Sequence, residues 1–216
     1  MKKFVSILPI LVILASFAAA FYFYPQLPGK VASHWNASGE VDGYMSKFWG
    51  TFLMPGVMAG MLLVFWLIPK IDPRKQNIRE FFDTFQTFTA SIFLFFGYVY
   101  ALAIWWNLDG RFNLAKFLVP AMAALFYFIG DLVGKARPNW FIGIRTPWTL
   151  ENETVWNTTH ALGGKLYKLC AFLALLSFFW AEKGLMIVII AIVGVSVFLV
   201  AYSYVEYIRQ RSIQGK

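Results

Sequence analysis

Long apolar stretches separated by short polar segments define the pattern of this chain. A helix needs about 20 predominantly apolar residues to cross a bilayer. Six stretches are long enough, and they cover residues 4–24, 49–69, 84–106, 114–134, 164–180 and 184–207. Because most connections between them are short, neighbouring helices should run antiparallel. The pattern predicts an all-α membrane protein built as a bundle of six transmembrane helices.

The first stretch also has features of a secretory signal peptide. Lys2 and Lys3 precede it, and the three alanines at 18–20 would suit a cleavage site. However, the apolar run continues to Tyr24, which is longer than the usual apolar core of a signal peptide. We therefore expect it to be retained as a span.

The composition agrees with a membrane protein. Apolar residues make up 59% of the chain and charged residues only 14%, whereas soluble domains contain about 25% charged residues. The net charge is +8, but most cations lie beside the ends of the predicted spans. The expected partner is therefore the lipid bilayer, with no direct binding of nucleic acid.

Lys and Arg are unevenly distributed between alternate loops. If the N-terminus faces the cytoplasm, the inner segments carry most of them, as the positive-inside rule requires. We therefore expect a multi-pass protein of the plasma membrane with both termini in the cytoplasm. This orientation predicts an outer loop at residues 25–48 and inner loops at residues 70–83 and 135–163.

The outer loop contains the pattern of a small β-hairpin. Residues 31–36 alternate in a way that favours a short strand, and Asn36 and Gly39 are typical of a turn. The candidate residues for binding a ligand here are His34, Trp35, Asn36, Asp42, Tyr44 and Lys47.

The first inner loop begins with Asp72 and Pro73. This pair is typical of a helix start, with Asp72 as an N-cap that accepts free backbone amides and Pro73 at the first helical position. The cations that follow suit topology and lipid contact, and docking of a partner is the alternative.

The second inner loop is dense in polar and aromatic side chains. Arginines can bind phosphate or carboxylate through two parallel hydrogen bonds. From Thr149, a plausible cap, the sequence favours a short helix that ends at Gly163 and Gly164, with Trp156 and His160 on one face. The candidate residues of the two inner loops for binding a regulator or a lipid are Asp72, Arg74, Asn77, Arg137, Asn139, Arg145, Thr146, Trp148, Trp156 and His160. A structural plug of the cytoplasmic side and a catalytic site are the alternatives.

Few groups suit transport or catalysis. No ionisable residue lies near the centre of a predicted span, which argues against an ion-coupled transporter. Neither His-Glu-x-x-His nor Gly-x-Ser-x-Gly occurs. His34, Glu40 and Asp42 could bind a metal, but their spacing matches no known site, and His160 should lie across the membrane. We therefore expect no catalytic residues, no metal and no cofactor.

Three segments carry a resemblance to a known family. The first is the outer segment with Leu27-Pro28, His34-Trp35-Asn36, Gly39-Glu40-Val41-Asp42-Gly43-Tyr44 and Lys47, and the second is the inner Ile71-Asp72-Pro73-Arg74-Lys75 with Asn77. The third is the stretch at residues 135–150, which contains Gly143-Ile144-Arg145-Thr146-Pro147-Trp148-Thr149-Leu150 and is followed by Glu153, Trp156, Thr159-His160 and Gly163-Gly164. Together they resemble the SdpI family, membrane immunity proteins against a secreted sporulation-delaying toxin. The outer segment is similar to the domain of unknown function that opens many members. The resemblance implies a two-helix unit at residues 1–83 and an SdpI-like four-helix unit at residues 84–216.

The resemblance also implies toxin immunity. A secreted peptide toxin would meet the outer hairpin, and the inner loops would then form a site for a cytoplasmic transcriptional regulator. One alternative is a protein or enzyme that binds lipid phosphate through Arg137, Asn139 and Arg145, and another is a transporter or scaffold subunit. The sequence specifies neither the toxin nor an oligomeric state.

Overall fold

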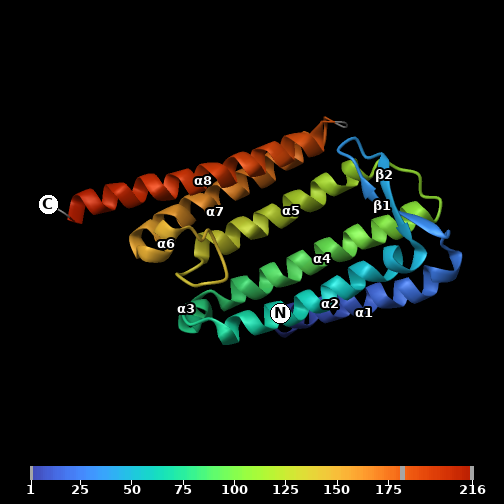
Figure 1. Ribbon diagram of the computed structural model, residues 1–216, viewed down its shortest axis with the longest axis horizontal. Coiled ribbons are helices and arrows are strands. Elements are labelled where there is room, and N and C mark those ends of the chain that lie inside the picture. Colours follow the sequence, from blue (N-terminus) through green and yellow to red (C-terminus); the bar gives the residue numbers. More distant parts are fainter. Residues whose placement is uncertain (1, 181–182, 215–216) are drawn as a thin grey trace.

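The computed structural model describes residues 2–180 and 183–214. Its elements, in chain order, are α1 (Lys2–Phe23), the 3-10 turn η1 (Tyr24–Gln26), β1 (Lys30–Trp35), β2 (Val41–Ser46), α2 (Lys47–Ile71), α3 (Lys75–Glu80), α4 (Phe82–Asn107), α5 (Leu114–Lys135), α6 (Pro147–Glu151), α7 (Glu153–Ser177) and α8 (Gly184–Gln214). The long helices lie side by side, with the two strands at one end of the bundle and the short helices α3 and α6 at the other (Figure 1).

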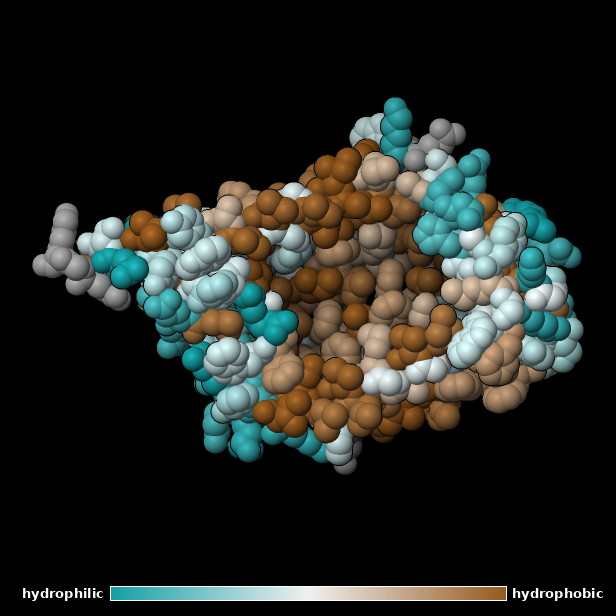
Figure 2. All heavy atoms as spheres, in the orientation of Figure 1, coloured by the Kyte–Doolittle hydropathy of each residue, from teal (hydrophilic) through white to brown (hydrophobic). Residues whose placement is uncertain are grey.

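The apolar helices match most of the predicted spans. Within the described residues, the helices long and apolar enough to cross a bilayer are Phe4–Gln26, Lys47–Ile71, Phe82–Asn107, Leu114–Lys135 and Gly184–Ile213. Figure 2 shows a broad hydrophobic band between two hydrophilic ends, the distribution that suits a surface in contact with lipid. The structure therefore confirms a mostly helical protein with several membrane-crossing candidates.

The fifth predicted span, residues 164–180, falls in α7, and here the prediction of two separate elements was wrong. The short helix expected to end at Gly163 and Gly164 continues through them, so α7 is one helix of 25 residues. Polar side chains along its N-terminal half keep α7 out of the five helices that are apolar enough to be candidate spans.

Gly163 and Gly164 lie inside α7, where α5 passes close beside them. A Cβ atom on Gly164 would lie 2.7 Å from the Cα of Gly134 and 2.9 Å from the carbonyl oxygen of Gly130. Gly130 and Gly134 are four residues apart on α5, so both face α7. Small residues at this spacing let two membrane helices approach closely. These glycines therefore serve helix packing.

The helices pack in two groups joined at the middle. α1, α2 and α4 form one group, in which Ile13, Met58 and Phe93 are buried together. α5, α7 and α8 form the other, with a core that includes Val119 and Val188. α4 and α5 lie against each other and connect the two groups (Figure 1).

The chain ends lie away from the hairpin. The first turn of α1 and the last turn of α8 both point toward the end of the bundle that carries α3 and α6 (Figure 1). α8 continues to Gln214, beyond the predicted span end at Tyr207, and its last turns carry Arg209 and Arg211. The hairpin and the inner loops thus form two separate polar regions at opposite ends of the molecule.

Candidate functional site

The outer loop folds as the predicted β-hairpin. β1 and β2 pair antiparallel, with Ala32 opposite Tyr44. The side-chain oxygen of Asn36 accepts hydrogen bonds from the backbone amides of Ser38 and Glu40, both at 3.0 Å. This arrangement closes the turn, so the Asn36 oxygen is occupied in shaping the hairpin.

The accessible face of the hairpin includes His34, Asp42 and Tyr44. The His34 Nδ1 atom is hydrogen-bonded to the Asp42 carboxylate, and these side chains are 70% and 45% exposed. Tyr44 is also exposed on β2. Lys47 turns back instead, and its Nζ atom lies 4.8 Å from the centre of the Tyr24 ring.

Two asparagines that the sequence analysis did not single out hold the hairpin on the bundle. The side chain of Asn107, at the end of α4, accepts a hydrogen bond from the Ala32 amide at 2.8 Å and donates one to the Ala32 carbonyl at 3.0 Å. It therefore pairs with β1 as a neighbouring strand would. Asn113 donates to the Ser38 carbonyl at 2.8 Å and caps α5 by accepting the Lys116 amide. In the sequence, both residues border an apolar stretch, which signals capping but not contact with a hairpin.

An aromatic cluster and a cavity lie beside the turn. The rings of Trp35 and Trp106 meet edge to face with centres 5.6 Å apart, and the Arg111 guanidinium lies 4.4 Å from the centre of the Trp106 ring. A cavity of about 580 Å³ opens between residues 38–41 of the hairpin and Trp106, Arg111 and Asn113. Aromatic surface, a cation and exposed backbone together suit a peptide ligand.

At the opposite end, Asp72 connects the two inner loops. Its carboxylate accepts the amide of Arg74 at 2.6 Å and that of Trp140 at 2.9 Å, and Asp72 is only 2% exposed. The Arg74 guanidinium also lies 5.8 Å from the centre of the Trp140 ring. The helix expected to begin at Pro73 begins at Lys75 instead. Asp72 is the C-cap of α2 and not the expected N-cap of the next helix. Its carboxylate instead joins Arg74 to a distant loop.

Two more contacts join the same loops. The Asn77 side chain donates to the Pro138 carbonyl at 2.7 Å. The Arg137 Nε atom lies 3.2 Å from the Glu80 carboxylate, in a pair whose side chains are more than half exposed. The structure thus brings Asp72, Asn77 and Arg137 together, as parts of one connection between α3 and the second inner loop.

Asn139 shapes its own loop. Its buried amide donates to two backbone carbonyls and accepts two backbone amides, all within residues 137–142. All four of its hydrogen-bonding positions are used, which leaves none for a ligand. Arg145 is exposed, and it donates to the Trp140 carbonyl at 2.6 Å.

The start of α6 contacts α8. Thr146, not the expected Thr149, is the N-cap, and its hydroxyl oxygen accepts the Thr149 amide at 3.2 Å. Thr149, the third helical residue, reciprocates, because its hydroxyl oxygen accepts a hydrogen bond from the Thr146 amide at 3.0 Å. The Thr146 hydroxyl also lies 3.0 Å from that of Ser203, and the rings of Trp148 and Tyr204 are 5.0 Å apart.

Trp156 and His160 lie on one face of α7, as predicted. Their rings stack with centres 3.9 Å apart, and the Trp156 indole donates to the Ala136 carbonyl at 2.8 Å. The His160 Nε2 atom accepts the Ile144 amide at 2.9 Å, while Nδ1 donates to the Trp156 carbonyl at 2.8 Å. His160 lies outside the candidate spans, and burial lowers its pKa to about 4 despite the opposing hydrogen bond to Trp156. It is therefore neutral at pH 7, with both ring nitrogens occupied.

Gly143 makes this arrangement possible. Its φ is +116°, and a Cβ atom there would lie 2.4 Å from the Nε2 atom of His160. Only glycine combines this backbone conformation with room for the imidazole.

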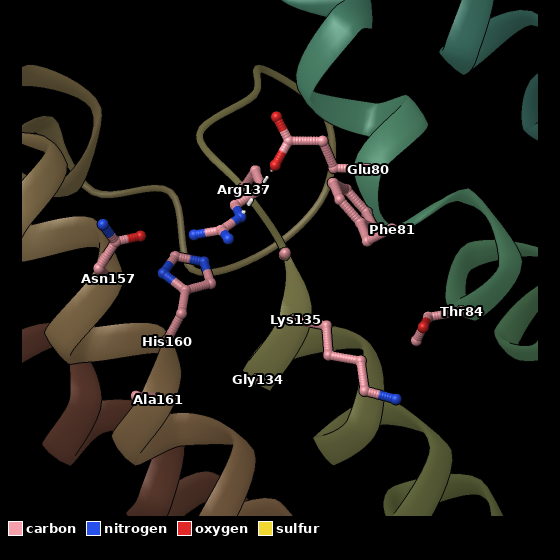
Figure 3. A pocket seen from close by; sticks show the side chains of 10 residues that line it. Glu80, Phe81, Thr84, Gly134, Lys135, Arg137, Asn157, His160 and Ala161 are labelled. Carbon is pink, nitrogen blue, oxygen red and sulfur yellow. Dashed lines mark ion pairs between the residues drawn. The ribbon is translucent and has the colours of Figure 1, made fainter.

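A cavity of about 570 Å³ opens beside His160, bounded by the starts of α4 and α7 and the end of α5. Figure 3 shows the Arg137 guanidinium reaching into it between Glu80 and the His160 ring, with the Asn157 side chain facing it. Within the part of the chain that the structure describes, no group of three or more His, Cys, Asp or Glu residues could hold a metal ion.

Comparison with known proteins finds a match in each of the two regions. Residues 11–59 match a domain of unknown function (DUF1648), and residues 135–203 match the SdpI/YfhL protein family. The chain is also 28% identical to the immunity protein SdpI of Bacillus subtilis (strain 168) over 208 residues, which cover 96% of this chain and 97% of that protein. Together these findings support the SdpI family for this chain. No solved structure matches it.

These findings bear out the resemblance and support a family of membrane immunity proteins. The two matched segments contain the outer hairpin and the second inner loop. The hairpin is attached where α4 ends and α5 begins. The cavity beside His160, the inner cavity, lies at the opposite ends of these helices, where α4 begins and α5 ends.

Proposed function

We propose that this SdpI-family protein protects a cell against a secreted peptide toxin and reports the toxin to a cytoplasmic transcriptional regulator. In this proposal the protein is multi-pass in the plasma membrane, the part of α7 from Gly164 onward adds a crossing to the five candidate spans, and the hairpin lies outside. Both termini face the cytoplasm, an orientation supported by the distribution of Lys and Arg. The similarity to an immunity protein over almost its whole length supports the protective role.

The placement of the two polar regions carries the proposal. The hairpin is anchored by Asn107 and Asn113, which belong to α4 and to the cap of α5. The opposite ends of these same helices border the inner cavity. A ligand that moves the hairpin therefore acts on two helices that reach the inner loops, which is the physical connection that a relay requires.

The hairpin is the proposed toxin site. His34 and Asp42 offer an exposed polar pair, and the Trp106 and Arg111 cluster borders a cavity of about 580 Å³. A peptide could place apolar side chains on the tryptophan and polar groups on the arginine and the His34–Asp42 pair. Residues 1–83 would then supply the hairpin, and residues 84–216 the aromatic cluster beside it and most of the inner cavity.

The inner loops are the proposed output. Asp72 is buried, so its bond to Trp140 should persist. The exposed ion pair between Arg137 and Glu80 contributes little to stability and can break when α4 and α5 shift. Trp140 and Phe141 are 46% and 39% exposed on the loop, and with Arg145 they offer an apolar and cationic surface to a regulator.

The protective role is tested by expressing the protein in a toxin-sensitive host. Protection should raise the lethal dose of a secreted peptide toxin to which this host is sensitive by about tenfold or more. Equal killing of cells with and without the protein, for every toxin tried, contradicts immunity.

The relay has its own test. In a Cys170→Ala background, an Asn157→Cys variant reports access to the inner cavity through its rate of modification by a thiol reagent. Adding toxin to membranes should change this rate about twofold or more, while a Ser212→Cys control at the end of α8 stays constant. Unchanged rates at both positions contradict the relay and leave immunity standing.

A further inference from the structure

We propose that the cavity beside His160 binds a phosphate group, held by the guanidinium of Arg137 and the side-chain amide of Asn157. This site lies at the opposite end of the molecule from the proposed toxin site. It requires no toxin, so it goes beyond the function proposed above.

The Arg137 guanidinium has hydrogen-bond donors that no described residue uses. Its Nε atom pairs with Glu80 at 3.2 Å, and its two terminal nitrogens form no hydrogen bond with any residue that the structure describes. Figure 3 shows these nitrogens directed into the cavity. A guanidinium fork matches two oxygens of a phosphate group, so an anion could bind here while the Glu80 contact remains.

The other residues that line the cavity supply further hydrogen-bond donors, and His160 has no ring nitrogen left to bind the ligand. Asn157 faces Arg137 from α7 (Figure 3), and its amide makes no hydrogen bond within the described residues. Lys135 also lines the cavity, although its Nζ atom pairs with Asp131 at 2.8 Å. His160 forms the floor with both ring nitrogens already bonded, so it neither donates to the ligand nor carries charge at pH 7. With Glu80 as the opposing carboxylate, the lining keeps a positive balance that favours an anion.

The depth of the cavity favours phosphate over carboxylate. It opens beside Lys135, the last residue of a candidate span, which is the level at which phospholipid phosphates lie. The remaining walls are small or apolar, including Phe81 and Ala161, and leave room for a glycerol unit. A lipid headgroup and a free phosphate share this chemistry, so the experiment must distinguish these sources.

The test measures ligand affinity of the purified full-length protein in detergent, through the shift of its thermal unfolding. The probes are dihexanoyl phosphatidylglycerol below its micelle concentration and inorganic phosphate. The variants are Arg137→Gln and Asn157→Asp, and the second leaves the Arg137–Glu80 pair in place while setting a negative charge against the ligand. The matched control is Arg79→Gln, which removes another exposed cation, on α3, that does not line the cavity.

We expect phosphatidylglycerol to bind, with affinity falling about tenfold or more in both cavity variants, as the loss of a charge-assisted hydrogen bond predicts. The control should keep the wild-type affinity. If inorganic phosphate binds as tightly and shows the same dependence, the site takes free phosphate and the proposal still stands. The proposal is overturned if neither probe binds, or if Arg79→Gln lowers affinity as much as the cavity variants do.

Discussion

The carboxylate of Asp72 accepts the backbone amide of Trp140 at 2.9 Å, although the two residues are 68 positions apart. The same carboxylate accepts the Arg74 amide, so one buried side chain defines the end of α2 and the path of the second inner loop. Neither amide forms another hydrogen bond within the described residues.

Asp72→Ala should therefore destabilise the protein. A buried backbone amide left without a partner costs about 1–3 kcal/mol, and a protein of this size loses about 2–4 °C of melting temperature per kcal/mol. Thermal unfolding in detergent should show a decrease of about 5 °C or more. Asp109→Asn is the control, because this exposed residue has a φ of 85° that Asn adopts readily. A wild-type melting temperature for Asp72→Ala would contradict the role assigned to this bond.

Gly164→Ala should also lower stability, through the crossing of α5 and α7. The new methyl group would meet backbone atoms of Gly134 and Gly130 within 3 Å, so the helices would have to separate. Gly194→Ala is the matched control, since nothing lies within 4 Å of a Cβ atom there and alanine is the better helix former. We expect opposite signs for the two changes in melting temperature, and equal effects would refute the close packing.

Stability should decrease in mild acid because His160 is buried in its neutral form. The unfolded chain binds a proton at His160 below the ordinary pKa of 6.5, whereas the folded chain binds it only near pH 4. This contribution is thus complete above pH 6.5 and is lost as the pH falls toward 4, to a total of about 3 kcal/mol. His160→Gln offers an acceptor to Ile144 but cannot be protonated. Melting temperatures across this range should fall less steeply for the variant, and parallel curves would argue against the assignment.

Cysteine labelling tests the orientation. In a Cys170→Ala background, Ser38→Cys on the hairpin turn should react with a membrane-impermeant maleimide in intact cells. Gln76→Cys in α3 should react only after the membrane is opened, and both positions are exposed in the structure. The reverse pattern would invert the topology and with it the placement of the toxin site.

Local patterns in the sequence predicted the elements better than their contacts. The outer hairpin and the shared face of Trp156 and His160 follow from alternation and helical spacing. The contact between Ala32 and Asn107 does not follow from such patterns. An asparagine at a helix end suggests a cap, and the sequence does not indicate that it bonds to a distant strand. The Gly163-Gly164 pair was misread for a related reason, since only the position of α5 shows that glycine is needed there for close approach.

The most direct test of the central claim is the killing curve of a sensitive host that expresses His34→Ala. The side chain is 70% exposed, and an exposed pair of this kind contributes only about 0–1 kcal/mol, so the variant should fold and reach the membrane in normal amounts. Lys30→Ala, an exposed change at the other end of β1, serves as the control. We predict that wild type and the control protect, and that His34→Ala loses about tenfold or more of the protection. Full protection by His34→Ala at equal membrane levels would contradict recognition of the toxin through His34 on the hairpin.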